Sequence, residues 1–337
     1  MLSLKNTISL VLSGDRQVGK TYQAKQVFDA VFPSWALVYK NPADLPTAAH
    51  PFRPMLVISC ENSTAGTMAE VIAHKDCTFI PIDNLEQFEH ALTILNHGHG
   101  AKYDADGDCT QKGQPFRSVF FDGWTAFTEG SKGDARGLAL TEGGGTKTLD
   151  DKAKQNDERN ISRAAGAEAR TAARLWASAA ATHTGILMLS TAHLQEKWMP
   201  KPGSKTRERI QTGETLDLPP KPLKWLLNNC NACFLLMRKL PEIGDLDDLD
   251  SDSPPDITPT YFALTQPVNA AGFERDAIKW QDGIFAPVNP CTPRNARMPK
   301  DVHVKWNNPD LGAALLESPL LITPPVPKPS KVPPPAA

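Results

Sequence analysis

Short apolar runs recur along most of the chain, and several of them end directly in a polar or acidic residue. Continuous apolar runs of this kind are typical of strands that are buried on both faces, as in a parallel sheet covered by helices. We therefore predict strands at 8–12, 36–40, 55–60, 77–82, 118–122, 185–193 and 231–240.

Amphipathic stretches lie between these runs. The clearest one places Phe88, Leu92 and Leu95 on one face of a helix. Asn84 and Gln87 form a capping box at its start. Further helices are expected at 21–32, 63–73, 161–182 and 221–229. The alternation of strands and helices predicts an α/β fold with a central, mostly parallel sheet flanked by helices.

The first strand leads into the sequence GDRQVGKT, which fits the phosphate-loop template G-x-x-x-x-G-K-[ST]. Gly14 and Gly19 let the backbone turn its N–H groups toward an anion, and the following helix directs its positive end to the same point. Lys20 can then reach the β- and γ-phosphates, and the Thr21 hydroxyl can bind Mg²⁺. We expect nucleotide contacts from the whole loop, namely Gly14, Asp15, Arg16, Gln17, Val18, Gly19, Lys20 and Thr21.

The run 118–122 ends in Asp122, so a buried strand would carry this acid to the carboxyl edge of the sheet. In phosphate-loop enzymes an acid at this place holds Mg²⁺ directly or through water. Apolar residues before an aspartate form a weak motif on their own, but the preceding phosphate loop in an alternating chain strengthens the interpretation. We therefore predict that Thr21 and Asp122 hold one Mg²⁺ ion.

The composition narrows the class of protein. The chain has 337 residues and a formal net charge of −2, which argues against a broadly basic nucleic-acid-binding protein but allows a local basic segment. No apolar run approaches the roughly 18 residues of a membrane span, so we expect no membrane partner. The N-terminal residues resemble a short signal peptide, yet cleavage there would destroy the phosphate loop. With six cysteines in a chain of this size, we expect reduced thiols and a cytoplasmic protein.

Two segments without apolar periodicity, 128–160 and 195–220, are expected to be long loops, and such loops are usually functional or disordered. The second combines an aromatic side chain with basic ones, which suits the phosphates and stacked bases of a single-stranded nucleic acid. Its candidate contacts are Lys197, Trp198, Lys201, Lys205, Arg207 and Arg209. In the helix between these segments, Arg163, Arg170 and Arg174 share one stripe, either as a solvated face or as a surface for a partner or nucleic acid.

The order of these elements resembles the core of RecA-like recombinases, and in particular the compact RecA-like ATPases of bacteriophages. The resemblance covers residues 5–285 and implies specific roles. Glu61 in LVISCENS would polarise the attacking water, Asp122 would be the Walker B acid, and His193 in LMLSTAH would sense the γ-phosphate. A second interpretation of Glu61 stays open, because an acid directly after a strand is often a helix cap.

The chain also departs from the RecA pattern. His193 replaces the sensor glutamine, Gly123 replaces the serine after the Walker B acid, and no polymerisation helix precedes the first strand. RecA-type filaments are therefore not implied. The resemblance does imply a homo-oligomer, with Arg275 as the candidate residue that acts across subunits. The expected organisation is a RecA-like core at 1–285, an extension at 286–317 and a disordered Pro-rich tail at 318–337.

The sequence thus predicts a Mg²⁺-dependent ATPase that acts on single-stranded DNA in phage recombination or replication. A single-strand-binding or replication protein is a candidate partner. Two alternatives stay open. In one, the ATPase moves or loads a protein partner and does not need Trp198 for stacking. In the other, the chain is a nucleotide-gated binding module with negligible hydrolysis and does not need Glu61. A GTPase is disfavoured, because the guanine motif N-K-x-D is absent from the chain.

Overall fold

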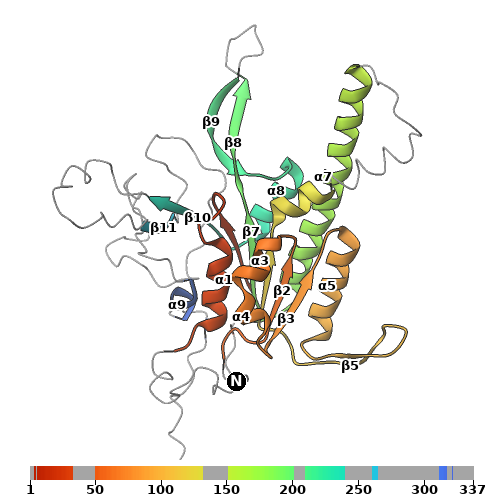
Figure 1. Cartoon of the computed structure of the whole chain (residues 1–337), viewed down its shortest axis with the longest axis vertical. Coiled ribbons are helices and arrows are strands. Elements are labelled where there is room, and N and C mark those ends of the chain that lie inside the picture. The colour runs from red at the N-terminus through yellow and green to blue at the C-terminus, as the bar shows by residue number, and fades with distance from the viewer. Residues whose placement is uncertain are drawn as a thin grey trace, which may run out of the picture.

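A computed structural model of the chain shows a central sheet flanked by helices (Figure 1). It describes residues 4, 6–32, 50–131, 151–200, 209–239, 260–264, 311–316 and 321. Within these residues the main sheet has seven strands in the order β11-β10-β1-β7-β6-β2-β3. The strands from β10 to β3 are parallel, and the edge strand β11 is antiparallel to β10. The structure confirms the predicted α/β class with a mostly parallel sheet.

The strands coincide with apolar runs of the sequence. They are β1 (Ile8–Ser13), β2 (Met55–Ser59), β3 (Cys77–Pro81), β6 (Ser118–Asp122), β7 (Leu187–Ala192), β10 (Ala232–Lys239) and β11 (Thr260–Leu264). Every residue of β1, β2, β6 and β7 is buried, which explains why these runs are mainly apolar rather than alternating. The strand expected at 36–40 lies outside the described residues.

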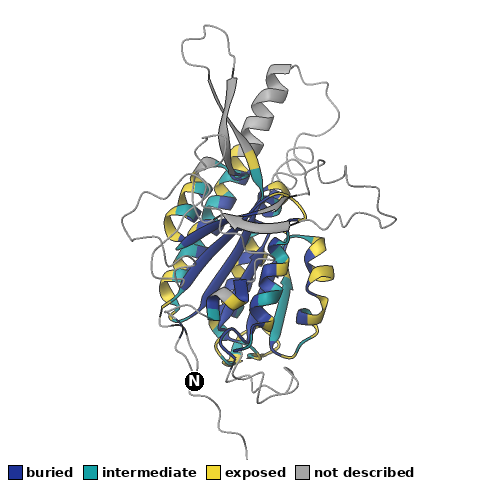
Figure 2. Cartoon of the chain, turned by 90° about the vertical axis from the view of Figure 1, so that its left-hand side faces the viewer, coloured by how far each residue is buried: buried dark blue, intermediate teal, exposed yellow. Residues whose placement is uncertain are grey.

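Helices cover both faces of the sheet, and the sheet separates the core into two clusters, one on each face. One face carries α1 (Lys20–Asp29), α3 (Asn62–Thr67), α4 (Ala69–Ile72) and α9 (Leu311–Leu316). The other carries α5 (Leu85–His97), α7 (Asp151–Thr182) and α8 (Pro220–Asn229). Figure 2 shows the buried sheet between the exposed outer sides of these helices. The Asn84 side-chain oxygen accepts the N–H of Gln87 at 3.0 Å, which confirms the predicted cap of α5.

The strand order brings the ends of four strands together at one edge of the sheet. β7 lies between β1 and β6, with Ser13 opposite Ala192. β2 lies on the other side of β6, with Ser59 opposite Asp122. Because the carboxyl ends of parallel strands share an edge, the residues that follow β1, β2, β6 and β7 converge there.

The two segments expected as long loops contain regular structure. Helix α7 begins at Asp151, so the segment 128–160 is not a loop throughout. The first turns of α7 lack apolar periodicity, but they are rich in charged residues that favour helices. The segment 195–220 forms a hairpin of β8 (Leu194–Pro200) and β9 (Arg209–Leu216) and then enters α8. Antiparallel pairing satisfies this backbone without the apolar alternation that identifies most strands.

The hairpin and the first part of α7 extend beyond the sheet at the edge where the parallel strands end (Figure 1). At the other end of the chain, α9 packs Leu311 and Leu315 against the core, and the N–H of Leu311 donates to Gln23 Oε1 at 2.9 Å. The boundaries of the core, extension and tail stay predictions. No helix within the described residues is long and apolar enough to cross a membrane.

Candidate nucleotide-binding site

The loop between β1 and α1 depends on two glycines. Gly14 has a φ of +146°, and a Cβ there would lie 2.5 Å from the carbonyl oxygen of Leu236 in β10. Gly19, the residue before α1, has a left-handed φ of +89°. Glycine adopts such angles without steric cost. The chain can therefore curl tightly between strand and helix, with the N-terminus of α1 facing the loop.

Lys20 is the first residue of α1, and its side chain folds back over the loop. Its Nζ donates to the carbonyl oxygens of Gly14 and Asp15 at 2.9 and 2.6 Å. Burial lowers the pKa of Lys20 to about 8, although the nearby Glu61 and Asp122 favour the charged form. At neutral pH the ammonium is therefore protonated but weakly solvated, which suits a group that meets a phosphate.

Asp122 is the last residue of β6, and its carboxylate is almost completely buried. Three hydroxyls donate to it: Thr21 Oγ1 and Thr64 Oγ1 at 2.8 and 2.7 Å, and Thr191 Oγ1 at 2.5 Å. Burial raises the pKa of Asp122, and the hydrogen bonds from the hydroxyls oppose that change. The Thr21 hydroxyl and this carboxylate are oxygen ligands of the kind that Mg²⁺ prefers, so the pair fits the predicted ion.

Thr64 and Thr191 are partners of Asp122 that the sequence analysis did not identify. Thr64 lies in α3, and its Oγ1 accepts a hydrogen bond from Ser59 Oγ at 2.7 Å. Thr191 lies in β7, and its Oγ1 accepts the N–H of Gly123 at 2.9 Å. Each hydroxyl thus receives one hydrogen bond and gives its own proton to the carboxylate. The sequence signal for Thr191 is a pair of polar residues, Ser190 and Thr191, near the end of the buried strand β7. Thr64 has no comparable signal.

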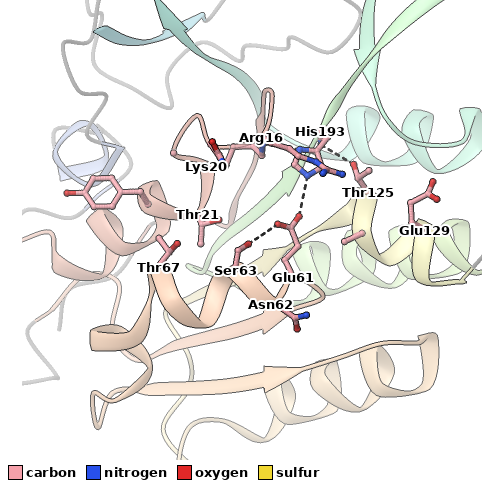
Figure 3. A pocket seen from close by; sticks show the side chains of 14 residues that line it. Arg16, Lys20, Thr21, Glu61, Asn62, Ser63, Thr67, Thr125, Glu129 and His193 are labelled. Carbon is pink, nitrogen blue, oxygen red and sulfur yellow. Dashed lines mark hydrogen bonds and ion pairs between the residues drawn. The ribbon is translucent and has the colours of Figure 1, made fainter. Parts of the chain in front are cut away.

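Glu61 and His193 lie just after β2 and β7 and face each other across the site (Figure 3). His193 Nε2 lies 3.5 Å from Glu61 Oε1, and its Nδ1 lies 3.2 Å from Lys20 Nζ. An ammonium can only donate, so Nδ1 accepts from protonated Lys20 and the Nε2–H faces the carboxylate. The contact with His193 lowers the pKa of Glu61, although burial acts in the opposite direction. Glu61 is therefore ionised at neutral pH.

Two observations bear on the alternative role of Glu61 as a helix cap. Glu61 occupies the N-cap position of α3, but its side chain makes no capping hydrogen bond. Ser63 Oγ instead donates to Glu61 Oε2 at 3.4 Å.

Gly123 leaves room for the Glu61 side chain, because a Cβ at Gly123 would lie only 3.1 Å from Glu61 Cγ. The glycine that departs from the RecA pattern leaves space for this carboxylate.

A pocket of about 880 Å³ lies at this edge of the sheet, and the predicted residues that line it are Arg16, Gln17, Gly19, Lys20, Thr21, Glu61 and His193. The predicted residues Gly14, Asp15, Val18 and the buried Asp122 are not part of its lining. Lys20, Thr21, Glu61 and His193 all reach it (Figure 3). This volume lies within the range of small-molecule sites, roughly 300–1,000 Å³. The remaining wall includes pocket residues that the sequence analysis missed, Thr125 and Glu129 among them, from the helix at 124–131.

The predicted nucleic-acid contacts lie elsewhere. Lys197 and Trp198 belong to β8 and Arg209 begins β9, so all three are placed on the projecting hairpin. The backbone of Trp198 is paired with that of Gln211, next to an irregularity in the register. The other predicted residues, Lys201, Lys205, Arg207 and the intersubunit candidate Arg275, lie outside the described residues.

The strand order, in which β7 separates the loop strand β1 from the Asp122 strand β6, is that of a RecA-like fold, and the loop sequence fits the phosphate-loop template. No protein-family model and no curated protein matches the chain. Among solved structures the chain is similar to a DnaB-like replicative helicase that was described with its interactions with primase. The sequence identity is 10%, the TM-score is 0.27, and the match covers 81% of this chain and 58% of the helicase chain. The chain thus spans less than two thirds of that helicase, and the fold assignment rests on the strand order rather than on this similarity.

We expect Gly14→Ala to destabilise the protein by about 2–4 kcal/mol, because the new Cβ would press on a backbone oxygen of the central sheet and strain φ. Urea unfolding followed by circular dichroism measures this change. Gly66→Ala in α3 is the matched control, because a Cβ at Gly66 meets nothing within 4 Å. The control should be neutral or slightly stabilising. Equal effects of the two substitutions would contradict the close approach at Gly14.

Proposed function

We propose that the protein is a Mg²⁺-dependent ATPase. The observation that carries the proposal is the convergence of Lys20, Glu61 and His193 above the buried Asp122 in one pocket. These are the group types that phosphoryl transfer to water requires, namely a cation for the phosphates, a metal-holding acid and a carboxylate that orients water.

Each residue has a distinct role in this proposal. Mg²⁺, when bound, would supply positive charge that offsets the charge of the phosphates. Thr21 and Asp122 would hold that ion, and Lys20 leaves the loop carbonyls to pair with phosphate oxygens. Glu61 orients the attacking water as an ionised carboxylate, and His193 keeps it in position through the Nε2–H. The hydroxyls of Thr64 and Thr191 orient the carboxylate of Asp122.

We further propose that the protein acts on single-stranded DNA as a homo-oligomer in phage recombination or replication, in the cytoplasm of the bacterial host. The β8–β9 hairpin supports this part, because it begins at Leu194, directly after His193, and carries Lys197 and Trp198. Basic and aromatic residues on one hairpin suit a phosphate backbone and its bases. A motor or loader that acts on a protein partner is the second candidate, since the same hairpin could contact protein.

Glu61→Gln should lower the rate of ATP hydrolysis at least about a hundredfold, because the amide cannot accept a proton from water. Nucleotide affinity should change little, since the phosphates bind elsewhere in the pocket. Steady-state phosphate release and titration with a fluorescent ATP analogue measure the two quantities. Glu129→Gln, a second acid of the same pocket, serves as the control and should stay within a few-fold of the wild-type rate. Full hydrolysis by Glu61→Gln would point to another water-orienting group, whereas negligible hydrolysis by both the wild type and the variant would favour a nucleotide-gated module.

Affinity for ATP should be constant below about pH 8 and should fall above it, because the pKa of Lys20 is about 8. Phosphate favours the ammonium form, so above pH 8 a neutral Lys20 must take up a proton when ATP binds, up to the ordinary lysine pKa near 10.4. In this range the affinity for ATP should fall by about tenfold per pH unit. Titrations from pH 7 to 10 measure it, with Lys20→Arg as the control that stays charged. A flat profile for the wild type would show that Lys20 does not contact the phosphates.

Single-stranded DNA should stimulate hydrolysis, and Trp198→Ala should reduce both the stimulation and DNA affinity. The loss of one stacking contact costs about 1–3 kcal/mol, which is roughly a fivefold to hundredfold change. Phosphate release with and without oligo(dT), at several salt concentrations, provides the measurement. Absence of both stimulation and salt-sensitive binding would eliminate the DNA role and favour a protein partner.

A further inference from the structure

The exposed side of helix α8 combines an aromatic residue with cations. Pro222, Leu226 and Cys230 are buried, whereas Lys221, Lys224 and Trp225 are exposed. Lys224 and Trp225 follow Lys221 by three and four positions, so all three lie on one side of the helix. Trp225 keeps 40% of its surface exposed, and an indole in this position is not needed for the core. This stripe is therefore a candidate contact surface.

A second basic stripe, on α7, meets the first. Arg163, Arg170 and Arg174 share one side of α7, and the Arg174 guanidinium carbon lies 5.6 Å from the centre of the Trp225 ring. This cation–π contact joins the two stripes into one surface, here called the α7–α8 surface. Glu168 falls well away from the arginine stripe on the helical wheel. No salt bridge is found between these cations and a carboxylate of the described residues.

The chemistry of this surface favours a nucleic acid over a protein. Its five cations would attract a phosphate backbone, and the uncovered part of the indole offers a stacking platform for a base. Tryptophan and arginine are also common at protein interfaces, but lysine is depleted there, and this surface exposes Lys221 and Lys224 beside Trp225. The surface also continues the β8–β9 hairpin, because β9 ends at Leu216 and α8 begins at Pro220.

We propose that the α7–α8 surface binds single-stranded nucleic acid, as a second contact beyond the hairpin. The proposal rests on the proposed function only for the choice of partner, and it does not involve the nucleotide pocket. A strand that leaves the hairpin would pass Trp225 and the lysines of α8 and then the arginines of α7.

Fluorescence anisotropy of labelled oligo(dT) with the full-length chain tests this proposal. Trp225→Ala should weaken binding roughly fivefold to hundredfold, through the loss of one stacked base. The double substitution Lys221→Gln and Lys224→Gln should reduce the slope of log affinity against log salt by about 1.4, or about 0.7 for each lost phosphate contact. Nucleotide affinity and DNA-independent hydrolysis should not change, because none of these residues lines the pocket.

The β4–β5 hairpin (Lys102–Tyr103 and Cys109–Gln111) provides matched controls at the opposite edge of the sheet (Figure 1). Tyr103 is also 40% exposed and lies beside Lys102, so Tyr103→Ala and Lys102→Gln should leave DNA binding unchanged. Wild-type affinity in Trp225→Ala, with binding still weakened by Trp198→Ala, would overturn the proposal and keep the DNA role of the hairpin.

Two further outcomes are informative. If the wild-type chain binds no oligonucleotide at all, both this proposal and the DNA part of the proposed function are wrong. If the wild type binds but Trp225→Ala has no effect, only the proposal about the α7–α8 surface is wrong. If Trp225→Ala changes the sedimentation of the protein without changing DNA affinity, the α7–α8 surface is an interface between subunits, and the proposal is wrong. Thermal unfolding of each variant establishes that it is folded, as expected for exposed residues.

Discussion

The site depends on the buried carboxylate of Asp122. A charge in this position is costly unless hydrogen bonds compensate for the lost water. The three hydroxyls that compensate for it come from α1, α3 and β7, so the carboxylate joins the phosphate loop, the segment after β2 and the sensor strand. The strand order makes this possible, because β7 and β2 flank β6 on either side. Asp122 therefore links elements that are far apart in the sequence, as well as serving as a candidate metal ligand.

Above this carboxylate, His193 connects the two groups that would act on the nucleotide. Its ring lies between Lys20 and Glu61, with one nitrogen directed at each. The imidazole accepts from the lysine and donates to the glutamate at once, which a glutamine amide could also do through its oxygen and its NH₂ group. If Lys20 moves to phosphate, Nδ1 loses its donor, and Glu61 keeps its contacts with His193 Nε2 and Ser63 Oγ.

The sequence was sufficient to predict the main strands and the acidic or polar residues at their ends, because these depend on local apolar runs. The roles of Glu61 and His193 came from the resemblance to RecA-like proteins and stay predictions, although the structure places both side chains beside Lys20. The sequence could not identify Thr64, whose hydroxyl matters only through a contact made across the sheet edge. It also missed the hairpin of β8 and β9, because neither segment alternates between apolar and polar residues along its length. The sequence could not identify Trp225 as a surface residue, because its exposure depends on which side of α8 packs against the core.

Thr125 connects the pocket to the hairpin. Its Oγ1 accepts the N–H of His193 at 3.0 Å and donates to the carbonyl of Asp217 at 3.3 Å. The N–H of Asp217 in turn donates to the carbonyl of His193 at 2.8 Å. These bonds join the start of β8 to the end of β9 beside a residue that lines the pocket. A shift of His193 on nucleotide binding would therefore move both strands of the hairpin at their base, and α8 follows only a few residues later. Under the proposed function, coupling between nucleotide and hairpin then needs no long pathway, because His193 is itself bonded to the hairpin base.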